Sequence, residues 1–152
     1  MDATDRKILA LLQAEGRLSL TALAERLPLS VSRCQRRVRE LERVGAIRGY
    51  RADVDPDKVG LHFSALAFVT LRQEDRDTVA RFEAGVAELS AVVSAQRLFG
   101  DPDYLLRIVT TDLDAYRRLY DDHLATMPGV HRLSSTLVMK TITENRPLPL
   151  GR

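Results

Sequence analysis

Arginines crowd one short stretch of this chain, and their spacing places most of them along one side of a helix. Residues 33–51 hold seven arginines and two glutamates, a local charge of +5. At about 100° of rotation per residue, a helix that begins near Ser30 has one apolar side, which carries Val31, Cys34, Val38 and Leu41. The opposite side carries Ser32, Arg36, Arg39 and Arg43. Guanidinium groups that project away from a buried face suit a helix that reads base edges in the major groove of DNA.

This pattern predicts a set of DNA-contacting residues on the helix and just beyond it. The candidates are Ser30, Ser32, Arg33, Gln35, Arg36, Arg37, Arg39, Arg43 and Arg48. The alternative is an ordinary solvated amphipathic helix. Surface helices of that kind usually mix charges and use lysine, whereas every cation here is an arginine and the stretch begins with serines. We therefore favour DNA binding.

A second run of residues that could bind a ligand is Gly100-Asp101-Pro102-Asp103-Tyr104. In a purely structural interpretation it is a tight turn, because aspartate and proline favour turns. In a functional interpretation the exposed amides of the turn hold a carboxylate, while Asp103 pairs with an ammonium group. Those are the two charged groups of a free α-amino acid. The residues alone leave both interpretations open.

Short helices must position the arginines. Ser19 can cap a helix that reaches Leu27, and Pro28 prevents its continuation. The turn to the next helix is only a couple of residues long, so the two helices must cross, as in a helix-turn-helix. A further helix is expected before residue 16, and residues 46–54 alternate as a strand or wing would. Three helices and a strand predict a winged or simple helix-turn-helix domain.

The second half of the chain has the pattern of a sheet with two helices. Strands are expected at 62–72, 91–100, 104–111 and 130–143, and helices at 76–89 and 113–127. The order β-α-β-β-α-β is the ferredoxin-like arrangement, so the fold class is α+β. Two helices cover one face of such a sheet. Because the strands are apolar on both sides, we expect the other face to be buried against a second copy.

The predicted domains are 1–52 for the helix-turn-helix, 53–61 for an acidic, turn-rich hinge and 62–152 for the ferredoxin-like domain. Residues 1–60 carry a charge of +3 and residues 61–152 a charge of −1, so the basic excess lies in the half expected to bind DNA. The composition of the whole chain is a separate indication of its class. With 45% hydrophobic and 29% charged residues, the 152-residue chain has the composition of a soluble globular protein. No apolar run is long enough for a membrane span. A single cysteine, Cys34, suits the reducing cytoplasm.

Four segments together resemble the Lrp/AsnC (feast/famine) transcription regulators. They are DRKILALLQAEGR, LSVSRCQRRVRELERVGAIRGYRADVDPDKVG, LFGDPDYLLRI and LDAYRRLYDDHLATMPGV. The resemblance runs from about Asp5 to Met139. It implies a DNA-binding half followed by a ligand-sensing half, assembled as homodimers and higher oligomers such as an octamer.

The resemblance also implies an amino acid or related effector, bound at subunit interfaces near the Gly100–Tyr104 turn. The residues expected to bind it are Leu98, Gly100, Asp101, Asp103, Tyr104 and Thr136. Arg97 and Phe99, just before the turn, are bulkier than a pocket for a small aliphatic side chain requires. They argue against leucine as the effector.

The sequence therefore predicts a cytoplasmic, sequence-specific transcriptional regulator whose partners are double-stranded DNA and a small amino-acid-like effector, with no membrane contact. We expect no enzyme activity, cofactor or metal. His62, His123 and His131 lack metal-ligand spacing, and no phosphate loop, nucleophile elbow or CxxC motif occurs. The alternatives are a nucleoid-type architectural DNA-binding protein without ligand response, and a small α+β dimeric enzyme.

Overall fold

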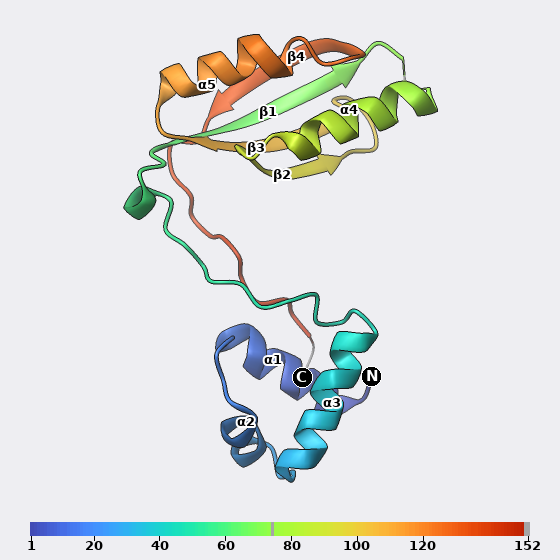
Figure 1. The fold of residues 1–152 in the computed structure, drawn as a ribbon, viewed down its shortest axis with the longest axis vertical. Coiled ribbons are helices and arrows are strands. Elements are labelled where there is room, and N and C mark those ends of the chain that lie inside the picture. Colours follow the sequence, from blue (N-terminus) through green and yellow to red (C-terminus); the bar gives the residue numbers. More distant parts are fainter. Residues whose placement is uncertain (74, 151–152) are drawn as a thin grey trace. The chain divides into compact units, whose positions relative to one another are not determined.

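The computed structural model describes residues 1–73 and 75–150, and the chain divides into two compact units (Figure 1). Unit 1 consists of Met1–Asp53 together with the C-terminal segment that starts at Ile142. Unit 2 is Val54–Thr141. Unit 2 is therefore an insertion between two parts of unit 1.

The C-terminal segment differs from its predicted assignment, since the sequence analysis placed everything after residue 61 in the second domain. Residues 142–150 have their contacts in unit 1. One of these contacts joins Leu148 to Gln13, 135 positions apart. Local sequence patterns do not indicate that the C-terminal segment contacts a helix so far away in the sequence.

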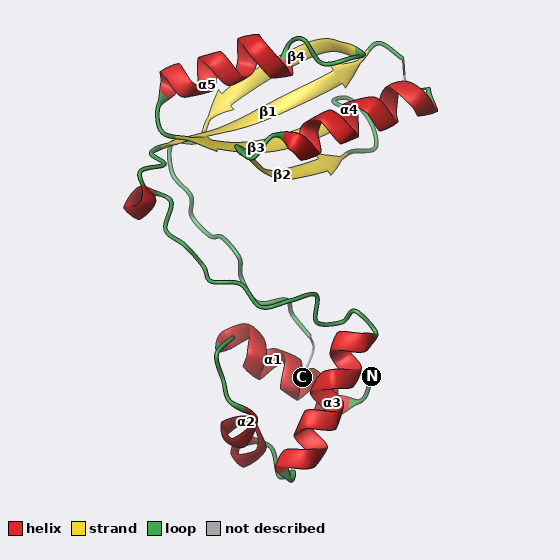
Figure 2. Cartoon of the chain, in the orientation of Figure 1, coloured by secondary structure: helices red, strands yellow, loops and turns green. Residues whose placement is uncertain are grey.

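Three helices form unit 1 (Figure 2). They are α1 (Ala3–Ala14), α2 (Leu20–Arg26) and α3 (Val31–Arg43). Each begins at a side chain that accepts a hydrogen bond from the first turn, namely Asp2, Ser19 and Ser30. The predicted caps Ser19 and Ser30 are confirmed, and so is the tight turn between α2 and α3.

The apolar stripes of the three helices meet in one core. Its buried members are Ile8, Leu23, Ala24, Leu27, Cys34, Val38 and Leu41. Cys34 is a free cysteine with no exposed surface. Val31 departs from the predicted apolar face, because 44% of its surface is exposed at the start of α3.

The strand or wing expected at 46–54 is wrong for the structure, which has only turns and irregular backbone there. Gly45 and Gly49 both have positive φ, 73° and 149°, which interrupts an extended strand. The amide of Ile47 donates to Leu41 O at 3.0 Å, and the Ile47 side chain packs against the core of unit 1. This segment therefore returns to α3 instead of joining a sheet.

Unit 2 confirms the predicted β-α-β-β-α-β order. Its elements are β1 (Phe63–Leu71), α4 (Arg76–Glu88), β2 (Val92–Arg97), β3 (Tyr104–Thr110), α5 (Leu113–Leu119) and β4 (Val130–Leu137). A short 3-10 turn, Asp57–Val59, precedes β1, and a π-helical turn, Tyr120–Leu124, continues α5. The strand order is β2-β3-β1-β4, with all neighbours antiparallel. The fourth strand ends earlier than predicted, at Leu137.

Alternation along β1 separates the two faces of the sheet. Ala65, Ala67, Val69 and Leu71 are buried in one core with Phe82 of α4 and Tyr116 of α5, so both helices cover the same face. The residues between them, including Leu66 and Phe68, face the other way and are only half-buried. Phe68 pairs with Leu105 on β3, which extends the apolar surface of this open face.

The described helices are all too short or too polar to cross a membrane.

Candidate functional site

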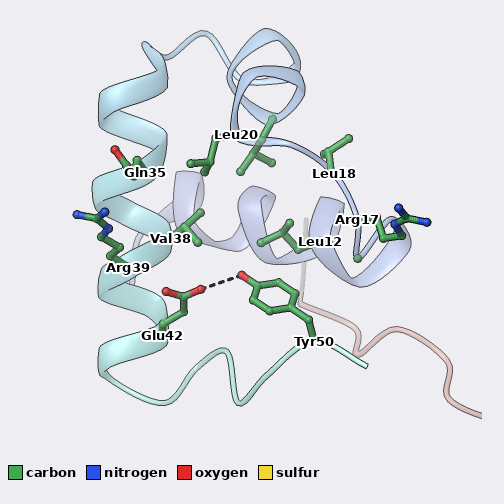
Figure 3. Close-up of a pocket in the computed structure, with 11 residues that line it drawn as sticks. Leu12, Arg17, Leu18, Leu20, Gln35, Val38, Arg39, Glu42 and Tyr50 are labelled. Atoms are coloured by element: carbon green, nitrogen blue, oxygen red, sulfur yellow. Dashed lines mark hydrogen bonds between the residues drawn. The ribbon is translucent and has the colours of Figure 1, made fainter. Parts of the chain in front are cut away.

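The outer face of α3 presents three arginines. Arg33, Arg36 and Arg39 are exposed, whereas Cys34 and Val38 on the other side of the helix are buried. Figure 3 shows Arg39 projecting from the side of α3 opposite to Val38. Three guanidinium groups on successive turns of one helix face form a continuous cationic surface, as a major-groove reader requires.

Ser30, Ser32 and Gln35 lie near the N-terminal end of the same helix. The Ser30 hydroxyl accepts from the amide of Arg33 at 3.4 Å, and the Ser30 and Ser32 hydroxyls are 3.2 Å apart. Ser30 therefore caps α3. Gln35 is half-buried. In helix-turn-helix proteins the N-terminal residues of the recognition helix contact base edges.

Arg37 is turned away from the outer face and holds α3 against α1. Its Nη1 lies 2.8 Å from Asp2 Oδ2 and 2.7 Å from Asp5 Oδ1. The side chain is 26% exposed. The hydrogen bonds that Arg37 donates to Asp5 and Asp2 raise the pKa of Arg37. The structure thus uses this predicted DNA contact inside unit 1, because position 37 lies at the edge of the buried face of α3.

Arg43 and Arg48 lie at the other end of the predicted set. Arg43 binds Glu40 of the same helix through two hydrogen bonds, 2.8 Å from Nε and 2.6 Å from Nη2, and this pairing raises the pKa of Arg43. The arginine side chain remains 71% exposed. Arg48 is exposed in the segment after α3. Both remain accessible to phosphates, although Glu40 offsets part of the charge of Arg43.

A hollow of about 380 Å³ lies behind α3 in unit 1 (Figure 3). Its walls include Leu12 of α1, Leu20 of α2 and Val38 of α3. Tyr50 closes one side, where its hydroxyl donates to Glu42 Oε1 at 3.0 Å. Burial and this bond to Glu42 raise the pKa of Tyr50. The hydrogen bond fixes the segment after α3 against the helix.

The predicted turn in unit 2 borders a second hollow, of about 570 Å³. Its lining residues are Thr70, Leu71, Arg97, Leu98, Phe99, Gly100, Asp101 and Asp103. Four of the six predicted effector residues thus come together here. Gly100 has φ of 116°, a conformation that other residues rarely adopt, so the glycine shapes this wall.

Asp103 joins the turn to the central strand. Its Oδ2 accepts a hydrogen bond from the amide of Leu71 at 2.6 Å, and its own amide donates to Val69 O at 2.9 Å. Its carbonyl accepts from the amide of Leu98 at 2.7 Å. A carboxylate has about four acceptor positions. Asp103 is therefore a structural anchor that keeps acceptor capacity for a ligand.

Asp101 is held by Arg132 of β4 and Thr70 of β1. Arg132 Nη2 donates to both of its carboxylate oxygens, at 2.7 and 2.8 Å, and Thr70 Oγ1 donates to Oδ1 at 3.0 Å. These bonds, with that of Arg132 the strongest, lower the pKa of Asp101. Asp101 therefore fixes the turn as an anion, and its charge is already paired.

Tyr104 and Thr136, the other two predicted effector residues, do not line the hollow. Tyr104 is 3% exposed, and its ring centroid lies 4.7 Å from that of Phe82 under α4. Its hydroxyl donates to Glu83 Oε1 at 2.9 Å. Thr136 of β4 pairs with Leu66 of β1 and lies on the open face. Tyr104 points into the core because alternation along β3 directs every second residue towards the helices.

The sequence analysis missed three residues that complete this site, namely Thr70, Leu71 and Arg132. In the register of β1 and β3, Val69 pairs with Tyr104, so the residues after Val69 lie beside the turn. The predicted ferredoxin-like order already implied that β1 and β3 are neighbours. Their register was the information that the sequence lacked.

Among the residues that the structure describes, no group of three or more His, Cys, Asp or Glu side chains is arranged to hold a metal ion.

Two family models match the chain. Residues 64–148 match the Lrp/AsnC ligand binding domain, and residues 1–48 match a winged helix-turn-helix DNA-binding model.

Characterised relatives match over almost the whole chain. The DNA-binding transcriptional activator DecR of Escherichia coli K12 is 34% identical over 99% of both chains. The Bkd operon transcriptional regulator of Pseudomonas aeruginosa is 36% identical over 99% of this chain and 98% of its own length. Among solved structures, a transcriptional regulator from Neisseria meningitidis in complex with L-Met has a TM-score of 0.92 and 38% identity, over 99% of this chain and 97% of that one.

Proposed function

The chain belongs to the Lrp/AsnC family of transcriptional regulators, and on that premise we propose how its two units work. It is a DNA-binding regulator with a ligand-binding domain, as its relatives are. In our proposal α3 reads operator DNA, and unit 2 senses an α-amino acid at the turn between β2 and β3. We propose no catalytic step for this protein. We also propose that it is located in the cytoplasm, where it meets the DNA.

The exposed arginine face of α3 carries the DNA proposal. Arg33, Arg36 and Arg39 are exposed, while Arg37 secures the helix to α1. The residues proposed to contact DNA are Ser30, Ser32, Arg33, Gln35, Arg36, Arg39, Arg43 and Arg48. Arginines near the middle of the face suit base edges, and those towards the end of α3 and beyond suit phosphates.

The hollow beside the turn carries the effector proposal. Asp103 offers its remaining acceptor positions to an ammonium group, and the backbone around Gly100 offers amides to a carboxylate. Leu98 and Phe99 line the same hollow and can contact an apolar side chain. The L-Met complex of the Neisseria meningitidis relative supports an amino acid as the class of ligand.

The open face of the sheet supports assembly of copies. Leu66, Phe68 and Leu105 leave a half-exposed apolar surface on the side without helices. We propose that this face is buried in a homodimer, with dimers assembling further to species such as octamers. A twofold axis would present two α3 helices to one pseudo-palindromic operator, about one helical turn of DNA apart.

Two measurements test the proposal. Selection from a random duplex library at low salt should recover a pseudo-palindromic motif, and recovery of no duplex would refute DNA reading by α3. A thermal-shift screen of the twenty amino acids should identify at least one that raises the melting temperature, because a ligand that binds only the folded state stabilises it. A motif without any such ligand would instead favour an architectural DNA-binding protein.

A further inference from the structure

The C-terminal segment makes side-chain and backbone contacts with α1 that neither DNA reading nor ligand sensing requires. The amide of Leu148 donates to Gln13 Oε1 at 2.7 Å, and Arg6 Nη1 donates to Leu150 O at 3.1 Å. Asn145 Nδ2 also donates to Asp53 Oδ1 at 3.2 Å. The segment thus runs along α1 from its C-terminal towards its N-terminal end.

The two contact residues of α1 share one helix face. Arg6 and Gln13 are seven positions apart, which is close to two full turns. Gln13 is half-buried, and its Nε2 has no exposed surface and no hydrogen-bond partner among the described residues. The position of Gln13 at the edge of the core is explained if its side-chain oxygen accepts a hydrogen bond from the backbone of a docked peptide.

The composition of the segment suits extended docking. Pro147 and Pro149 flank Leu148, and proline lacks an amide hydrogen and keeps φ near −65°. Leu148 is therefore the only residue of these three that can donate from its backbone, and this donor is the one that Gln13 accepts. A segment that is already restricted to an extended conformation loses less entropy when it docks.

We propose that the face of α1 marked by Arg6 and Gln13 is a docking surface for an extended, proline-containing peptide, and that its occupant is the chain's own segment Asn145–Leu150. The DNA-binding unit is then completed by residues that follow the ligand-binding unit in sequence. Unit 2 has two covalent connections to unit 1, at Asp53 and at Ile142. This arrangement does not depend on the identity of the effector or operator.

Cross-linking of the full-length chain tests the occupant. Ala10→Cys, an exposed position between Arg6 and Gln13 on the same face of α1, combined with Leu148→Cys should be joined by a short bis-maleimide, while Cys34 is buried and does not react. A product that migrates as a single chain in denaturing electrophoresis supports the proposal. A product of two chains would show that the segment docks on another copy, and absence of a product would show that the surface is not occupied. Either result overturns the proposal.

Hydrogen exchange of the full-length protein tests the contact itself. Leu148→Pro and Leu148→Ala both remove the leucine side chain, but only proline removes the donor amide. Exchange of the α1 amides should be about fivefold faster in Leu148→Pro, the effect of losing one ordinary hydrogen bond, and should change little in Leu148→Ala. Gln13→Ala should behave like Leu148→Pro, with Lys7→Ala on the same helix as control. Equal exchange in all four variants would overturn the proposal, and the result is independent of whether DNA or an amino acid binds.

Discussion

Helix α3 and the turn between β2 and β3 both carry charged side chains, but they use them in different ways. On α3 the helix satisfies its own backbone, so Arg33 and Arg36 extend into solvent. At the turn, Asp103 accepts from the amide of Leu71 and Asp101 is bound by Arg132. The exposed arginines Arg33 and Arg36 are therefore available for a partner, whereas the two aspartates first stabilise the turn.

The same contrast occurs within α3 itself. Arg36 and Arg37 are adjacent, yet Arg36 is exposed and Arg37 is bound to Asp2 and Asp5 of α1. Adjacent residues of a helix point about 100° apart, and this rotation leaves Arg36 accessible to DNA while Arg37 contacts α1. Charge alone does not identify a functional residue.

The largest effect is expected from Phe68→Arg. This variant tests whether α3 and the turn between β2 and β3 both depend on the proposed homodimer through the open face of the sheet. A charge buried in the proposed interface without a partner costs on the order of 3–5 kcal/mol. Sedimentation of the full-length variant should show a monomer at micromolar concentration, with weaker operator binding because the two α3 helices are no longer paired. Ala84→Arg, on the exposed side of α4, is the control. If Phe68→Arg stays fully assembled, the open face is not the interface.

The second prediction separates the two roles of Asp103. Asp103→Ala leaves the amide of Leu71 without an acceptor, which should lower the free energy of unfolding of unit 2 by about 1–3 kcal/mol. It should also weaken effector binding by roughly ten- to a hundredfold. Asp103→Asn keeps an oxygen for Leu71 but has no charge for an ammonium group.

Calorimetric titration of Asp103→Asn, with the amino acid that stabilises the unsubstituted protein, is the decisive measurement. Weak effector binding with nearly normal stability supports the ligand role. Unaltered affinity would reduce Asp103 to an anchor of the turn, and the effector site would have to be sought elsewhere.

The elements that depend on local sequence were predictable. The caps Ser19 and Ser30 and the helix breaker Pro28 determine where α2 begins and ends and where α3 begins, and these are properties of neighbouring residues. The order of strands and helices in unit 2 followed equally well from periodicity. The strand expected at 46–54 does not form, because Gly45 and Gly49 adopt positive φ values that the alternation of residue types does not indicate.

The parts that depend on distant pairings were not predictable. The bonds of Arg37 to α1, of Asp103 to Leu71 and of Leu148 to Gln13 join residues far apart in sequence. Tyr104 directly follows Asp103, and its place in the sequence predicts that it belongs to the turn, although strand alternation directs it into the core. Side-chain direction at the start of a strand depends on register, which one sequence does not reveal.

The third prediction compares Arg36→Ala with Arg37→Ala, two neighbours that lose the same charge. If Arg36 reads a guanine edge, its loss should cost about 1–3 kcal/mol of discrimination between operator and mismatched DNA. Arg37→Ala should instead lower the melting temperature of unit 1, because Asp2 and Asp5 lose their partner. Arg48→Ala should weaken binding to all duplexes alike and reduce its salt dependence. Fluorescence anisotropy with matched and mismatched duplexes separates these outcomes, and equal loss on both duplexes for Arg36→Ala would assign it to phosphates.

The smallest effect is expected from Tyr104→Phe, which tests the exclusion of this residue from the effector site. Burial and the hydrogen bond to Glu83 raise the pKa of Tyr104 to about 12. An unfolded tyrosine titrates near pH 10, so between about pH 10 and pH 12 the unfolded state loses its proton first. The contribution of Tyr104 to stability is therefore complete below about pH 10 and is lost as the pH rises through about 12. Phenylalanine cannot titrate, so the difference in unfolding free energy between the original protein and Tyr104→Phe should shrink across this range.

Denaturant unfolding at a series of pH values measures this difference, and effector titration at neutral pH completes the test. Tyr50→Phe, whose hydroxyl binds Glu42 in unit 1, is the matched control, since it removes the same chemical pair from the other unit. Effector affinity should be unchanged in both variants, because Tyr104 does not line the hollow beside the turn. A loss of affinity confined to Tyr104→Phe would mean that the core under α4 and the ligand site are coupled through β3. The effector would then depend on β3 as well as on the turn between β2 and β3, and the two could no longer be assigned separate roles in binding and support.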